Sequence, residues 1–171
     1  MTVDEAYAWN ANWLWSLPLI VLNVVFHVVG LGFINSGVLN TLQRVTDRRH
    51  FLILFVLVVG AATLSATLLH AIEAGTWAIA FVALGALPDH KVAMLYSLNA
   101  MTTYGHDNSF LAPHWKLMGA LEALNGMLLF GLTTAFLYGI IRRVWPIESR
   151  ELHAPHMPWQ RPAKAPATIR H

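Results

Sequence analysis

Long uncharged, apolar runs alternate with short polar clusters along the whole chain. Three of these runs reach or exceed the roughly 20 residues that an α-helix needs to cross a bilayer core. The pattern therefore predicts an all-α membrane protein with three transmembrane helices. We expect a first helix over residues 17–42, an outer helix over residues 51–87 and an inner helix over residues 113–144.

A fourth apolar run, residues 92–101, has about half of a spanning length. Pro88 and Asp89 end the run before it, and Thr102 and Thr103 follow it. Apolar segments of this size are typical of re-entrant or buried elements rather than of full spans. We therefore expect residues 92–112 to form a half-length helix and a loop that returns to the side from which it entered.

Composition agrees with a membrane protein. Of the 171 residues, 56% are hydrophobic and 12% are charged, whereas a soluble domain is roughly 45–50% apolar and about 25% charged. The absence of cysteine excludes disulfides and thiolate-bound metals. The pI near 9.2 comes from a few Lys and Arg residues at the ends of the apolar runs, so we expect membrane lipids and no nucleic acid as partners.

Orientation follows from the positions of Lys and Arg, which favour the cytoplasmic side. Arg44, Arg48 and Arg49 follow the first run, and Arg142 and Arg143 end the last one. We therefore expect an inner-membrane, multi-pass protein with residues 1–16 as an external segment. Residues 145–171 are rich in proline and polar side chains, which predicts a disordered cytoplasmic tail.

The stretch directly after the half-length run carries the candidate function. It comprises Thr102, Thr103, Tyr104, Gly105, His106 and Asp107. Irregular backbone at membrane depth is tolerated only against protein or around a water-filled cavity. No internal repeat is visible, so each chain supplies one such loop, and several copies are expected to share one aqueous axis.

Residues 93–137 resemble the pore helix, filter and inner helix of the potassium-channel superfamily, in particular its small bacterial members with two or three spans. The family filter T-V-G-Y-G-D aligns without a gap with residues 103–108, and Trp115 and Lys116 match an aromatic-basic pair that starts the inner helix. The resemblance implies a homotetramer with a pore-loop architecture. It also implies that residues 102–107 form the selectivity filter, that Asn108 lies at the outer mouth, and that Gly126 and Gly131 allow the inner helix to bend.

Two filter positions depart from the family. His106 replaces the tyrosine, and Asp107 replaces the second glycine, whose dihedral angles a side chain disfavours. Both changes put potassium selectivity in doubt, while four Asp107 carboxylates would attract cations at the outer mouth. Two other interpretations remain open: Asp107 caps a turn, and His106 packs behind the loop.

The sequence thus predicts a passive channel for monovalent cations, K⁺ or Na⁺ or both, that is weakly selective or non-selective, with no cofactor and no enzymatic activity. A non-conducting pseudo-channel is one alternative. A membrane metal or haem redox protein is another, since ionisable residues within spans are functional candidates. Its ligands would be His27, His70, Glu73 and Glu122. His70 and Glu73 share one helical face, and a buried polar tie between helices is the simpler role for them.

Overall fold

The computed structural model describes residues 3–44, 51–105 and 111–144, and within these ranges it is helical with no strand. His106, Asp107, Asn108 and the expected tail, residues 145–171, lie outside the described residues. The elements, in chain order, are α1 (Val3–Arg44), α2 (Phe51–Ala83), α3 (His90–Met101), the 3-10 turn η2 (Pro113–Trp115) and α4 (Lys116–Val144).

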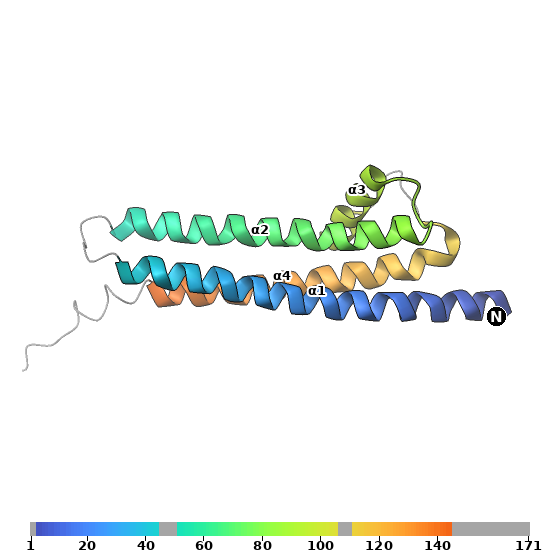
Figure 1. Cartoon of the computed structure of the whole chain (residues 1–171), viewed down its shortest axis with the longest axis horizontal. Helices are drawn as coiled ribbons and strands as arrows, with labels where there is room; N and C mark the ends of the chain where they lie inside the picture. Colours follow the sequence, from blue (N-terminus) through green and yellow to red (C-terminus); the bar gives the residue numbers. More distant parts are fainter. Residues whose placement is uncertain (1–2, 45–50, 106–110, 145–171) are drawn as a thin grey trace, which may run out of the picture.

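The three long helices α1, α2 and α4 lie side by side, and the short helix α3 lies at the end of the bundle where α1 begins (Figure 1). Helix α1 packs against both α2 and α4, and α3 packs against the same two helices. The chain therefore crosses the length of the bundle three times, and α3 is inserted between the second and third crossings.

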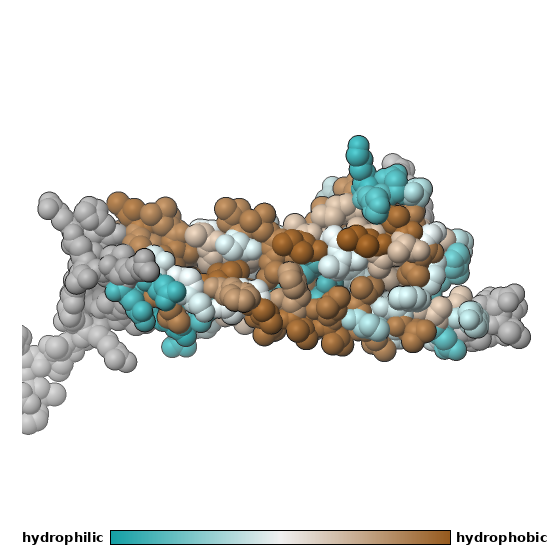
Figure 2. All heavy atoms as spheres, viewed as in Figure 1, coloured by the Kyte–Doolittle hydropathy of each residue, from teal (hydrophilic) through white to brown (hydrophobic). Residues whose placement is uncertain are grey.

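The outer surface is much more apolar than that of a water-soluble bundle. Large apolar side chains point outward, among them Phe33, Leu52 and Ile79. Brown, apolar spheres dominate the middle of the face in Figure 2, and teal spheres gather near its two ends. Soluble monomers rarely expose apolar patches of this size. Three helices, covering Tyr7–Gln43, Leu52–Ala83 and Pro113–Arg143, are long and apolar enough to span a membrane, so the chain has the features of a multi-pass membrane protein.

The interior, by contrast, contains many polar side chains. The buried polar residues are Asn12, Ser16, Asn23, His27, Glu73, Ser97, Glu122, Asn125 and Thr133. Four of them, Asn12, Ser16, Asn23 and His27, come from α1 alone, at spacings that place them on one face of the helix. Lipid offers no hydrogen bonds to these groups. Asn12, His27 and Thr133 bond to residues of other elements, whereas the side chains of Ser16 and Asn125 have no hydrogen-bond partner among the described residues.

Helix α1 begins at Val3, well before the expected start at residue 17, and it continues through Pro18. Asn12 joins this extension to the start of α4. Its Nδ2 donates to the carbonyl oxygens of Ala8 and His114, both at 2.6 Å, and its Oδ1 accepts from the backbone N–H of Met118 at 2.8 Å. Asn12 thereby caps one of the free backbone N–H groups that every helix start leaves unpaired.

Helix α3 has a sharply defined start. The Asp89 side chain accepts hydrogen bonds from the backbone N–H groups of Lys91 and Val92, at 2.8 and 3.0 Å, as a helix N-cap does. The turn before it contains Gly85 at φ 66°, a conformation that glycine adopts without a Cβ penalty. These two features end α2 and restart the chain as a separate helix.

Helix α3 ends with a Schellman motif in which the left-handed residue is not glycine. Thr103 has φ 56°, its N–H bonds to the carbonyl of Ala100, and the N–H of Tyr104 bonds to the carbonyl of Asn99. A β-branched residue in this region is an outlier and costs roughly 1–3 kcal/mol. Backbone strain of this kind is concentrated at functional sites.

The chain returns to the end of the bundle from which α3 started. The N–H of Ala112 donates to the carbonyl oxygen of Ala86 at 3.3 Å, and η2 and α4 follow directly. Both ends of the segment that contains α3 therefore meet at one end of the bundle.

We expect Asn12→Ala to lower the stability of the protein by about 1–3 kcal/mol, because it leaves the buried N–H of Met118 and the partly buried carbonyl of His114 without their partner. Thermal unfolding in detergent, followed by circular dichroism, measures this loss. Asn10→Ala is the matched control, since Asn10 is exposed on the same helix. Equal melting temperatures for the two variants would show that the Asn12 bridge contributes nothing.

Candidate functional site

The C-terminal end of α3 contacts α4 in the middle part of the bundle. A Cβ added to Gly126 would overlap the backbone of Met101, the last residue of α3. At a rise of about 1.5 Å per residue, Gly126 lies roughly 15 Å along α4 from its first residue. A bilayer core is about 30 Å thick. Measured from the first residue of α4, the close approach of Met101 to Gly126 therefore lies at about half of that thickness.

The residues after α3 are exposed in the single chain. Thr102, Thr103, Tyr104 and Gly105 all lie on the surface, and Tyr104 is 79% exposed. A groove of about 310 Å³ lies beside them, lined by Thr103 and Gly105 and by residues of α3 and α4 that include Ala120. The loop is thus continuous with an uncovered face of α4.

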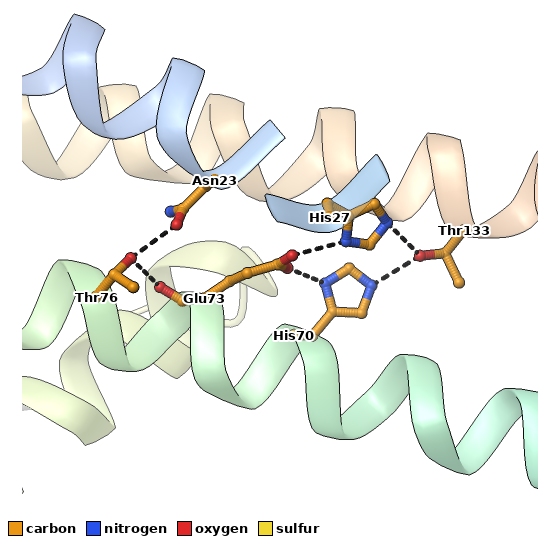
Figure 3. Close-up of polar contacts among 6 residues, drawn as sticks. All are labelled: Asn23, His27, His70, Glu73, Thr76 and Thr133. Carbon is orange, nitrogen blue, oxygen red and sulfur yellow. Dashed lines mark hydrogen bonds and ion pairs between the residues drawn. The ribbon is translucent and has the colours of Figure 1, made fainter. Parts of the chain in front are cut away.

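A second candidate site lies where α1, α2 and α4 meet (Figure 3). Glu73 of α2 is fully buried between two histidines. Its Oε1 is 2.8 Å from Nδ1 of His27 on α1, and its Oε2 is 3.2 Å from Nδ1 of His70, one turn away on α2. The three ligand atoms lie within 4.8 Å of one another.

Thr133 of α4 closes this cluster on the opposite side of both rings. Its Oγ1 is 3.0 Å from Nε2 of His27 and 3.0 Å from Nε2 of His70. The His70 ring also stacks on Phe130 of α4, with ring centroids 4.4 Å apart. Each long helix therefore contributes at least one side chain, and we name His27, His70, Glu73 and Thr133 the His–Glu cluster.

A pair of polar side chains extends the cluster toward the end of the bundle where α1 begins. Thr76 donates to the side-chain oxygen of Asn23 at 2.8 Å and also approaches the carbonyl of Glu73 at 2.7 Å (Figure 3). This contact ties α1 to α2 one turn from Glu73.

Glu122, the fourth residue of the metal alternative, does not belong to this group of ligands. It is fully buried on α4 and faces Ser97 of α3. Glu122 lies roughly 16 Å along α4 from Thr133, at about 1.5 Å per residue. Asn125 is buried near it, and neither atom of its side-chain amide has a hydrogen-bond partner within the described ranges.

Thr133 carries no sequence signal that marks it as a site residue. Thr133 lies in a run of apolar and hydroxyl residues, and the neighbouring Thr134 bonds only to the carbonyl of Phe130 in its own helix. Threonine often satisfies its hydroxyl in this way within membrane helices. Only the tertiary structure distinguishes Thr133 from Thr134. The His70–Glu73 pair, by contrast, is visible from its spacing of three residues.

Comparisons with models of protein families, with curated proteins and with solved structures found no match.

We expect Gly126→Ala to destabilise the protein by about 1–3 kcal/mol, because its Cβ would force α3 away from α4. Gly139→Ala is the matched control on the same helix: nothing lies within 4 Å of a Cβ at that position, so the change should be neutral or stabilise the helix by up to about 1 kcal/mol. Thermal unfolding in detergent compares the two. If both variants melt like the wild type, the contact between Met101 and Gly126 is not close.

Proposed function

We propose that the chain is a subunit of a homotetrameric channel that conducts monovalent cations passively, with weak selectivity between K⁺ and Na⁺. The channel lies in the cell membrane with the N-terminus outside and the C-terminus in the cytoplasm. Residues 102–107 form its filter, and Asn108 lies at its outer mouth. No covalent chemistry is required for conduction.

The single observation that carries this proposal is the half-length helix that begins and returns at one end of the bundle. Helix α3 has 12 residues, or roughly 18 Å at 1.5 Å per residue, too short to cross a bilayer core of about 30 Å. It is followed by residues 102–105, all of which are exposed. Non-helical backbone at that depth needs protein or water around it, and a shared aqueous axis would supply both.

Assembly around such an axis is favoured by the uncovered face of α4. Its exposed residues recur every three or four positions and are Ala120, Leu124, Met127, Gly131, Thr134 and Tyr138. Several of them are small, and small residues allow membrane helices to approach closely. Since Ala120 lines the same groove as Thr103 and Gly105, the loop and this face would point toward the same axis. Cyclic symmetry is the expected arrangement of such an assembly.

The direction of α3 also favours cations near the loop. The C-terminal end of a helix carries a partial negative charge, and this field is strongest within the last turn. Thr102 and Thr103 follow that end directly. Four such helix ends directed at one axis would lower the energy of a cation at the level of the loop.

Native mass spectrometry in mild detergent and lipid tests the assembly, and planar-bilayer recordings in mixed sodium and potassium test conduction. We expect a tetramer and a cation current that protein-free bilayers lack. A stable monomer or dimer under every lipid condition would contradict the proposed architecture. A tetramer without current would instead support the pseudo-channel.

We expect Asp107→Gly combined with His106→Tyr to increase the preference for potassium, because the change restores the filter pattern of the potassium-channel superfamily. Asp107→Asn should lower cation attraction while keeping the shape of the side chain. Asn10→Ala, on the exposed face of α1, is the control. If the reversal potential and conductance stay unchanged in both Asp107 variants while current is recorded, Asp107 does not line the ion path.

A further inference from the structure

We propose that His27, His70 and Glu73 form a binding site for one divalent transition-metal ion, such as Zn²⁺, where α1, α2 and α4 meet. This site is separate from the proposed filter, and its test does not depend on conduction. One ring nitrogen of each histidine and one carboxylate oxygen of Glu73 lie within 4.8 Å of one another, and Nδ1 is the ring nitrogen that lies next to Glu73 in both histidines. The His27 and Glu73 side chains are fully buried, and the His70 side chain is 12% exposed.

Two of the buried ligand atoms lack a hydrogen-bond partner. His70 Nδ1 and Glu73 Oε2 approach to 3.2 Å, but their geometry is not that of a hydrogen bond, and neither atom has another partner within the described residues. Buried polar atoms are rarely left unsatisfied, and each exception calls for an explanation. A cation that accepts a lone pair from both atoms would satisfy them together.

The protons available in the His–Glu cluster also favour a metal ion on the Nδ1 side of the two rings. If both Nδ1 atoms donate to Glu73, both Nε2 atoms of neutral rings are acceptors, and they compete for the single hydroxyl proton of Thr133. With a metal on the Nδ1 side, both rings carry the proton on Nε2. Both then donate to the two lone pairs of Thr133 Oγ1, and every ring nitrogen has a partner.

Thr133 therefore has the position that supports metal-binding histidines in known sites. A ligating histidine almost always donates its other ring N–H to an oxygen, which fixes the tautomer and the orientation of the ring. Here one hydroxyl oxygen, 3.0 Å from each Nε2, performs this for both rings.

The donor set restricts the kind of ion. Two imidazole nitrogens and one carboxylate suit Zn²⁺ and the other divalent first-row transition metals, whereas Ca²⁺ and Mg²⁺ prefer oxygen ligands. Three protein ligands leave a fourth position for water or hydroxide. A hydroxide there would neutralise the single positive charge that remains on a divalent ion bound by one carboxylate.

The test is the metal content of the purified full-length chain without an affinity tag. After equilibration with Zn²⁺ and removal of free ion, mass spectrometry of the metal should find close to one zinc per chain. Substituted Co²⁺ should give the visible absorption of a site with nitrogen and oxygen ligands. Glu73→Gln and His70→Asn should each weaken binding about tenfold or more, and Thr133→Val, which keeps all three ligands, should weaken it about 10–100-fold.

Two controls isolate the site. Glu122→Gln alters the other buried carboxyl within the spans and should retain the metal. The combined variant His153→Asn, His156→Asn and His171→Asn removes histidines outside the described residues and should also retain it. Less than about a tenth of a zinc per chain in the wild type overturns the proposal. So does zinc that persists in both Glu73→Gln and His70→Asn, or zinc that is lost only with the three distal histidines.

Discussion

The packing of the three long helices depends on Glu73, a carboxylate buried in a region that the surrounding lipid cannot solvate. A buried charge is tolerated only when it is paired and hydrogen-bonded. His27 and His70 supply the pairing, at 2.8 and 3.2 Å, and Thr133 joins both rings to α4. Rotating any one of these helices about its axis would break at least one of these contacts, so the cluster specifies how the helices face one another.

The same constraint explains why the polar side chains of the spans lie between the helices while the exterior is apolar. Between membrane helices apolar contacts have little advantage over contacts with lipid, and hydrogen bonds and close packing decide the arrangement. Asn12 joins α1 to α4, the contact between Asn23 and Thr76 joins α1 to α2, and Gly126 lets α3 approach α4. Together these contacts fix how α1, α2 and α4 face one another and where α3, which precedes the proposed pore loop, lies against α4.

Much of the helical architecture could be predicted from the sequence, because the length of an apolar run and the positions of its flanking polar residues depend on local chemistry. The three spans and the short helix between the last two were predicted in this way. The expected helix 51–87 ends at Ala83 in the structure, and α1 begins at Val3 rather than at residue 17. In this extension Asn12 bonds to residues of η2 and α4 that are more than 100 positions away in the sequence.

The sequence by itself determined that this chain is helical and suited to a membrane, and that His70 and Glu73 share a helical face, since these properties follow from runs and spacings within one segment. Only the tertiary structure decided that His27 and Thr133 join this pair and that Glu122 does not. The physical reason is that the sequence pattern within one helix shows which residues share a face, but not which neighbouring helix that face contacts. Which sides meet is determined by long-range contacts, above all by the need to pair buried polar groups where no water is available.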